Sequence, residues 1–537
     1  MNSRMPFDAS RLRAVTSSLH AWARRRVERH LGGYRRQVNA PDPALPRSPA
    51  EPRRVAVIGG GLAGMTAAVT LAERGFHVTL LERHTFLGGK VGSWPVQLPD
   101  GTTLQVEHGF HAFFRHYYNL NRLLEKTGTT RHFKDIGDYV ILTCDGGRRS
   151  YRDVERTPLL NIFSLAKHGH YRLRDMPLGP RSRKLVDLLS YDEDRTFAAY
   201  DDVSFEDFAK AAALPPDLQL AFRTFARAFF AEEDRVSMAE LIKSFHFYYL
   251  SHDFGLIYDY LDDDAERTLN QPLRRLLDEH GARILLGAEV PAIGRRGEGF
   301  EVLGEPYDAV VLAADVVGTR RIAAASAFLR DEDPVLHERL DRLRPGQPYV
   351  VLRLWTDRPF DPDLPMFILT ERIKLLDSIT TYHRAQAESA AWAAAHGGSV
   401  LELHCYAVPD DVDASDGPAI RRQLLAEMET YFPELRGCTI HHEHLQIRHD
   451  FSAFHLGMRR DRPPHLTGIP GLYLAGDWVR LPHPAMLMEA ACMSGLLCAN
   501  AIFQREGLQE EPIFAVPEKG ILATPFTLRR AGAPAAG

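Results

Sequence analysis

Three glycines near the start of the chain have the spacing of a phosphate-binding turn. Gly59, Gly61 and Gly64 follow an apolar run at residues 55–58, and the pattern predicts a helix over residues 62–74. In such a unit the first glycine permits a tight turn and the second lets a pyrophosphate approach the backbone. The third lets the helix pack closely on the strand. The spacing therefore predicts a site for a dinucleotide.

The start of that helix and the end of the next strand supply further contacts. The N–H groups at Leu62 and Ala63 lie at the expected helix N-terminus, which favours negatively charged phosphate. Glu82 closes a strand predicted at residues 78–81, and its carboxylate can accept hydrogen bonds from both ribose hydroxyls. Arg83, beside it, is assigned to the same site. Because an acid here disfavours a 2′-phosphate, NADP is not the expected ligand.

A second glycine turn narrows the choice of dinucleotide. Gly88, Gly89 and Lys90 follow Glu82 by a few residues and place a basic group near the pyrophosphate. This arrangement is typical of FAD-binding folds of the glutathione-reductase and amine-oxidase type, and NAD-only dehydrogenases usually lack it. The predicted cofactor is FAD.

A third motif lies near the end of the chain. Gly476 and Asp477 follow a predicted strand, and the long apolar helix that comes next begins near Ala485 and contains Met488. The Asp477 carboxylate can accept a hydrogen bond from a ribityl hydroxyl of FAD. The helix N-terminus would stabilise negative charge on a reduced flavin.

These motifs predict an α/β chain with a Rossmann-like FAD-binding domain of the glutathione-reductase/amine-oxidase type, into which an α+β substrate domain is inserted. Val290 belongs to a strand predicted over residues 282–290, and Ala313 ends a buried strand predicted over residues 307–314. We expect the FAD-binding domain to consist of residues 53–112, 268–318 and 466–505. The substrate domain then consists of residues 113–267 and 319–465. The first of these insertions is rich in aromatic residues, which form either an ordinary helical core or the lining of a long apolar pocket.

The two ends of the chain differ from the rest. Residues 1–52 form an arginine-rich arm and a proline-rich linker, and residues 506–537 form a C-terminal tail. Leu12, Val15 and Leu19 recur with helical spacing, so the arm is either a helix on an anionic membrane surface or a poorly ordered tail.

Composition limits the remaining options. The net charge of −5 gives no indication of nucleic-acid binding, and the five cysteines show no Cys-x-x-Cys spacing. A reducing compartment is expected, so the protein is placed in the cytoplasm, with peripheral contact at the inner face of the membrane through the arm. The histidine-rich run at residues 441–455 is read as strand surface, and no metal site is predicted.

The segment after the glycine turns carries the candidates for acid–base chemistry. Glu107, His108 and His111 lie within a stretch that mixes ionisable and aromatic residues. Each can donate or accept a proton near a flavin, although a histidine in such a stretch is more often structural.

Together these residues resemble the flavoprotein amine-oxidase and phytoene-desaturase superfamily. The run from Glu107 to Phe114 is similar to the Glu-x-Gly-x-His-x-Phe-Phe pattern of plant-type phytoene and zeta-carotene desaturases. The strings from Gly88 to Trp94 and from Gly109 to Leu120 together most resemble the aryl-carotenoid synthases, which are β-carotene desaturase/methyltransferases. Lys90 stands where arginine is commoner in these families. The positive charge is kept, but the paired hydrogen bonds that a guanidinium group can donate are lost.

The resemblance implies a carotenoid-like apolar substrate, desaturated by hydride transfer to flavin and loss of a proton, with a methyl shift in the aromatising relatives. Glu107, His108 and His111 are then the candidates for the base. Since the sequence has one dinucleotide fingerprint, we expect a quinone or O₂ to reoxidise the flavin. The alternatives are an FAD-dependent amine oxidase, a carotenoid isomerase or saturase, and a non-catalytic flavoprotein.

Overall fold

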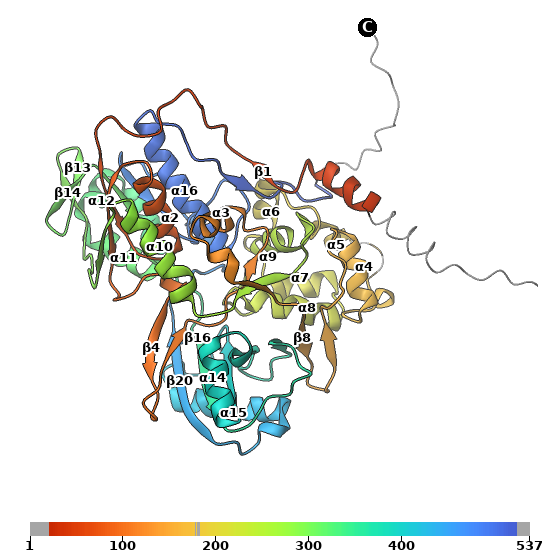
Figure 1. Cartoon of the computed structure of the whole chain (residues 1–537). Coiled ribbons are helices and arrows are strands. Elements are labelled where there is room, and N and C mark those ends of the chain that lie inside the picture. Colours follow the sequence, from red (N-terminus) through yellow and green to blue (C-terminus); the bar gives the residue numbers. More distant parts are fainter. Residues whose placement is uncertain (1–20, 178, 180–182, 524–537) are drawn as a thin grey trace, which may run out of the picture.

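A parallel sheet is assembled from three distant stretches of the chain and lies toward the left of the molecule in Figure 1. The computed structural model describes residues 21–177, 179 and 183–523. The strands are apolar on both faces, as a sheet covered on both sides requires. In spatial order they are β11 (Arg283–Leu286), β3 (His77–Glu82), β2 (Arg54–Ile58), β15 (Ala309–Leu312) and β21 (Leu472–Leu474).

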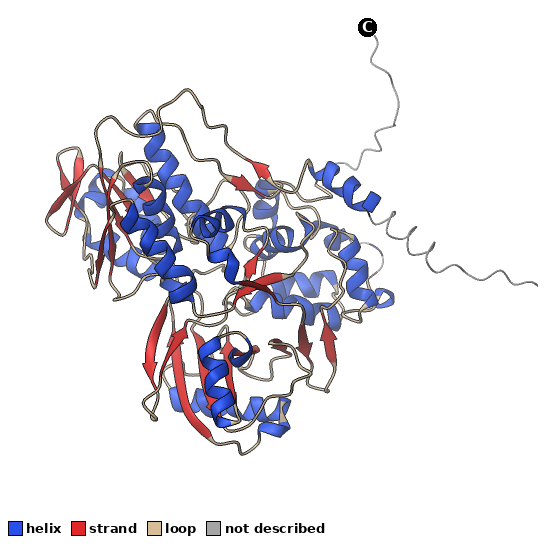
Figure 2. Ribbon diagram, in the orientation of Figure 1, coloured by secondary structure: helices blue, strands red, loops and turns tan. Residues whose placement is uncertain are grey.

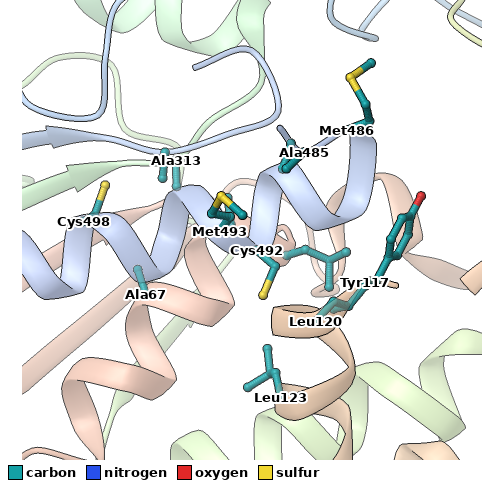
Figure 3. Close-up of a cluster of buried hydrophobic side chains, with 14 of the residues drawn as sticks. Ala67, Tyr117, Leu120, Leu123, Ala313, Ala485, Met486, Cys492, Met493 and Cys498 are labelled. Atoms are coloured by element: carbon teal, nitrogen blue, oxygen red, sulfur yellow. The ribbon is translucent and has the colours of Figure 1, made fainter. Parts of the chain in front are cut away.

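Helices α2 (Leu62–Ala72), α16 (Leu487–Arg505), α3 (Tyr118–Lys126) and α10 (Gln271–Glu279) pack beside this sheet in one apolar cluster. Figure 3 shows how Ala67 of α2, Cys492 and Met493 of α16, and Leu120 of α3 meet in it. By length and composition α16 could cross a membrane, but 61% of its most apolar window is buried in the protein. Its close contact with α2 depends on Gly495, where a Cβ would lie 2.3 Å from the Ala63 carbonyl oxygen.

Three of the expected elements have different ends. The strand expected over residues 307–314 is β15, which stops at Leu312, so Ala313 lies just beyond it. β11 stops at Leu286, so Val290 lies beyond the strand and not within it. The reason is local. Gly287 has a φ of +67°, and its N–H donates to the carbonyl oxygen of His84, beyond the last residue pair between β11 and β3. The first helix ends at Ala72, two residues before the expected end.

A second, mainly antiparallel sheet of seven strands lies below the first in Figure 1. One face packs on α15 (Gly417–Tyr431) through Ile420, Leu424 and Met428. α14 (Ala387–His396) adjoins the same sheet. The strands, in order, are β20 (Ile440–Arg448), β16 (Tyr349–Thr356), β19 (Ser399–Cys405), β18 (Ser378–Thr381), β17 (Phe367–Thr370), β8 (Tyr139–Leu142) and β9 (Arg148–Ser150).

The third part is mainly helical, as the colouring of Figure 2 makes clear. Ser204 caps α7 by accepting the Asp207 N–H at 3.0 Å. The helices are α4 (Leu160–Lys167), α5 (Arg183–Asp187), α6 (Glu193–Tyr200), α7 (Phe205–Ala212), α8 (Pro216–Arg227) and α9 (Met238–Phe245).

Shorter elements complete the chain. Helices α11 (Val316–Ala325), α12 (Ala327–Glu332) and α13 (Pro334–Arg342) follow strand β15 of the parallel sheet. The small sheets are β4 (Ser93–Gln97) with β5 (Thr103–Glu107); β6 (Phe113–Phe114), β10 (Tyr258–Leu261) and β7 (Phe133–Asp135); and β12 (Gly294–Arg296), β13 (Gly299–Val302) and β14 (Glu305–Tyr307).

The described parts of the arm and the tail pack on the body of the molecule. β1 (Arg36–Gln37) pairs with β22 (Phe514–Ala515), and Asn119 of α3 donates to the carbonyl oxygen of Phe514 at 2.7 Å. The expected arm residues Leu12, Val15 and Leu19 lie outside the described residues, while residues 21–31 are helical.

Candidate active site

The glycine turn after β2 has the shape that a bound pyrophosphate needs. Gly59 has a φ of +112°, and a Cβ there would lie 2.5 Å from the Ala313 carbonyl oxygen. A Cβ at Gly64 would lie 1.9 Å from the carbonyl oxygen of Gly59. For a Cβ added at Gly61 the nearest atom would be Gly89 Cα at 3.9 Å, so the space in front of the helix N-terminus is open. This cradle, beside the free N–H groups of the first turn of α2, fits a diphosphate.

Glu82 is held firmly at the end of β3. Its carboxylate accepts the N–H of Gly60 at 2.7 Å and the N–H of His84 at 2.8 Å, and each oxygen keeps a lone pair for a ribose hydroxyl. Arg83 turns to Asp315, with a separation of 2.8 Å between Nη2 and Oδ2. Both acidic residues and Arg83 line the same cavity.

The second and third motifs meet across this cavity. The ammonium nitrogen of Lys90 lies 3.6 Å from a carboxylate oxygen of Asp477 and 4.5 Å from the ring centre of Phe451. The other Asp477 oxygen accepts the Ser452 hydroxyl at 2.7 Å. Gly476, with a φ of +145°, donates its N–H to Ser494 of α16. The fold thus gathers the predicted FAD residues around one cavity, which is also lined by Leu62, Ala63, Gly88, Gly89, Val290, Ala313 and Met488.

The cavity continues from these residues into a long apolar extension. The volume of the whole cavity is about 610 Å³. Beyond the glycine turns its walls come from the helical part and from the seven-stranded sheet. Many of the aromatic side chains noted in the sequence line it, including Phe222, Phe225, Phe229, Phe245, Tyr248, Tyr249 and Tyr258. Both interpretations hold, because Phe222, Phe229 and Tyr248 line the cavity and also belong to the apolar core cluster that includes α2 and α16.

The three candidate acid–base residues are not equivalent. His108 and His111 line the cavity, whereas Glu107 lies outside its lining and accepts the Ala265 N–H at 2.8 Å. Burial raises the pKa of Glu107 to about 7, and it lowers the pKa of His111 to about 4. Burial also lowers the pKa of His108, with Arg448 adding to the shift. The two histidines are therefore neutral at pH 7.

A second set of polar residues faces the cavity and was missed in the sequence. Tyr406 and His404, at the end of β19, line it, and His404 is hydrogen-bonded to Ser378 and Glu402. Glu402 pairs with Arg353 inside the protein at 2.7 Å. The available signal was Glu402 and His404 at alternate positions of a strand that was otherwise apolar, which places both on one face.

The first part of the histidine-rich run lies in β20, an edge strand of the seven-stranded sheet, where His441, His442 and His444 contact the rings of Trp392, Trp355 and Trp94, and His449 and His455 follow the strand. Within residues 21–177, 179 and 183–523, no group of three or more His, Cys, Asp or Glu side chains is arranged to hold a metal ion.

The parallel sheet, the diphosphate cradle and the adjoining cavity define an FAD-dependent oxidoreductase. Residues 62–503 match the family described as flavin containing amine oxidoreductase, and the chain belongs to that family.

Individual relatives agree with this assignment. The chain is 37% identical to a carotenoid phi-ring synthase of Streptomyces griseus, over 92% of this chain and 96% of that protein. It is 29% identical to a carotenoid phi-ring synthase of Chlorobaculum tepidum, over 88% of this chain and 92% of that protein. The solved structure of cyclohexylamine oxidase from Brevibacterium oxydans shares the fold, with a TM-score of 0.60 at 15% identity over 85% of this chain and 99% of that chain.

Proposed function

We propose that the protein desaturates the ring end group of a carotenoid and aromatises it with a methyl shift. The observation that carries this proposal is the apolar, aromatic-lined extension that leads away from the FAD residues within one cavity. Such a wall fits a polyene. The two phi-ring synthase relatives, matched along nearly their whole lengths, support the same substrate class.

The chain's own residues hold and shield the substrate. FAD, when bound, supplies the acceptor for a hydride removed from an allylic carbon. The rings of Phe225, Tyr248 and Tyr258 enclose the polyene, exclude water, and present aromatic faces that stabilise a delocalised cation. The final electron acceptor would be a quinone or O₂.

Expression in a host that accumulates β-carotene tests the proposal. We expect a pigment with an aromatic ring, lighter than β-carotene by four hydrogens per modified end, detected by chromatography with absorbance and mass detection. A product that has lost hydrogens but shows no aromatic signals would support desaturation and contradict the methyl shift. A pigment of unchanged mass, with soluble FAD-loaded protein, would contradict the proposal. An amine screen with peroxide detection would then test the oxidase alternative.

We further propose that the substrate enters from an anionic membrane. Four large apolar side chains are exposed on neighbouring elements. They are Trp22 (56%) in the helix at residues 21–31, Phe163 (61%) on α4, Leu173 (53%) in residues 173–175, and Val186 (46%) on α5. We call this set the α4–α5 face. The elements are neighbours, because Val27 and Leu31 lie in one apolar cluster with Leu159 and Leu189. In Figure 1 the helix at residues 21–31 (red) lies beside α4 and α5.

Two features favour a membrane as the occupant of the α4–α5 face. The opposite sides of the same elements, at Ile162, Leu165 and Leu185, line the cavity, so the face adjoins the expected substrate path. Exposed arginines surround it, including Arg25, Arg29 and Arg172. Exposed apolar groups with a basic margin suit a surface of anionic lipid.

Vesicle sedimentation tests this second proposal. Wild-type holoprotein should bind vesicles that contain phosphatidylglycerol more strongly than vesicles of phosphatidylcholine alone. Phe163→Glu with Leu173→Glu should reduce binding at least tenfold, whereas Val335→Glu, at another exposed apolar position on α13, should not. Equal binding by both sets of variants would contradict it.

A further inference from the structure

A continuous line of hydrogen-bonded side chains crosses the cavity-facing side of the seven-stranded sheet. The hydroxyl of Tyr406 lies 2.8 Å from Ser378 Oγ, and Ser378 Oγ lies 3.0 Å from His404 Nδ1. His404 Nε2 lies 2.9 Å from Glu402 Oε1, and the other Glu402 oxygen lies 2.7 Å from Arg353 Nε. The first member lines the cavity and the last two are fully buried.

The buried ion pair determines the direction of each hydrogen bond. Arg353 holds the pKa of Glu402 down to about 2 against the effect of burial, so the carboxylate is ionised and can only accept. A neutral imidazole at His404 then donates through Nε2–H to this carboxylate, which leaves Nδ1 as an acceptor. Ser378 donates to that nitrogen, and its oxygen accepts the proton of Tyr406. Every donor then points inward from the cavity wall.

This polarity suits the uptake of a proton from the cavity. When a proton reaches His404, the resulting imidazolium is stabilised by the Glu402 carboxylate in direct contact. The two cavity histidines are less suitable. His108 lies near the cations Arg448 and Lys90, and His111 is anchored through its Nε2 to the Lys90 carbonyl oxygen at 2.9 Å. A positive charge is thus better accommodated at His404.

Resting on the proposed function, we propose that Tyr406 removes the proton from the oxidised substrate, with Ser378, His404 and Glu402 as positioning residues. A C–H bond of the polyene cation breaks, and its electron pair forms the new double bond. The proton goes to the Tyr406 oxygen as the phenol proton passes to Ser378, and the Ser378 proton passes to His404 Nδ1. The total charge is conserved, since the positive charge moves from the polyene to the imidazole.

Steady-state kinetics of purified holoenzyme test the relay, with β-carotene in lipid vesicles and a soluble quinone as acceptor. Tyr406→Phe and Ser378→Ala should each lower kcat by about 10²-fold or more, with KM and bound FAD unchanged within about twofold. Tyr431→Phe is the matched control, because it packs against the same sheet, lies outside the cavity lining and donates its hydroxyl to the Glu371 carbonyl oxygen, away from the relay. It should keep kcat within about threefold.

The double variant distinguishes a relay from two separate structural effects. If the residues act as one unit, Tyr406→Phe with Ser378→Ala should lose no more kcat than the worse single variant. Wild-type-like kcat in Tyr406→Phe, losses that multiply, or losses confined to KM or FAD content would each overturn the relay while the proposed function stands. A wild-type enzyme that turns over no carotenoid would overturn both.

Discussion

Adding one methyl group at Gly61 should weaken FAD binding without disturbing the folded chain. Gly61 has a φ of −77° and a ψ of −179°, which an alanine adopts without strain, and the nearest atom to its Cβ would be Gly89 Cα at 3.9 Å. We therefore expect Gly61→Ala to change the free energy of unfolding of the apoprotein by about 1 kcal/mol or less.

The cofactor is affected because the methyl group would occupy the space in front of the N-terminus of α2. The first bond within that helix runs from the Met65 N–H to the Gly61 carbonyl oxygen, so the preceding N–H groups are available to a phosphate. Displacing the diphosphate from one or two of these charge-assisted hydrogen bonds costs about 2–4 kcal/mol. The Kd for FAD should rise roughly 30- to 1,000-fold.

Calorimetric titration of apoprotein with FAD, combined with thermal unfolding of the apoprotein, measures both effects. Gly64→Ala is the contrasting variant, since its Cβ would lie 1.9 Å from the Gly59 carbonyl oxygen and should reduce stability as well as binding. Gly294→Ala, on an edge strand with its nearest neighbour at 3.5 Å, should change neither. Wild-type affinity in Gly61→Ala, or a loss of stability equal to that of Gly64→Ala, would refute the reasoning.

Three further changes test other parts of the structure. Glu107→Gln should keep kcat within about fivefold, since this side chain lies outside the cavity lining; a loss of 10²-fold or more would restore it as the base. Burial raises the pKa of Glu489 to about 7, so its contribution to stability is complete below its ordinary value near 4.5 and is lost as the pH rises through 7. Thermal unfolding from pH 5 to pH 8 should therefore show declining stability. Glu489→Gln, which alters the acceptor for Asn119 at the start of α3, should flatten that decline by up to about 3 kcal/mol. Parallel curves for the variant and the wild type would contradict the assignment. Gly495→Ala should lower the melting temperature of the apoprotein, since its Cβ would lie 2.3 Å from the Ala63 carbonyl oxygen, and an unchanged melting temperature would argue against this helix contact.

The cofactor motifs could be read from the sequence because each consists of neighbouring residues with local conformational requirements. Gly59 needs a positive φ, Gly64 needs a close helix contact, and Glu82 ends a strand, so spacing alone fixes their roles. The parallel strands were also predictable, because continuous apolar runs mark strands that are buried on both faces. The end of β11 has a local signal as well, because Gly287, with a positive φ, turns the chain directly after Leu286, and the prediction of a strand as far as Val290 passed over it.

What the sequence determined by itself was the FAD-type fold and the residues expected around the diphosphate. What the tertiary structure decided was how distant residues combine in the catalytic part of the cavity. Ser378 lies on β18, Arg353 on β16, and Tyr406 directly after β19, so no shared spacing or other local pattern links them. Likewise, Glu107 and His111 are four residues apart in the sequence, yet only His111 faces the cavity. Local patterns record backbone conformation, whereas the meeting of side chains depends on how strands pair and sheets pack.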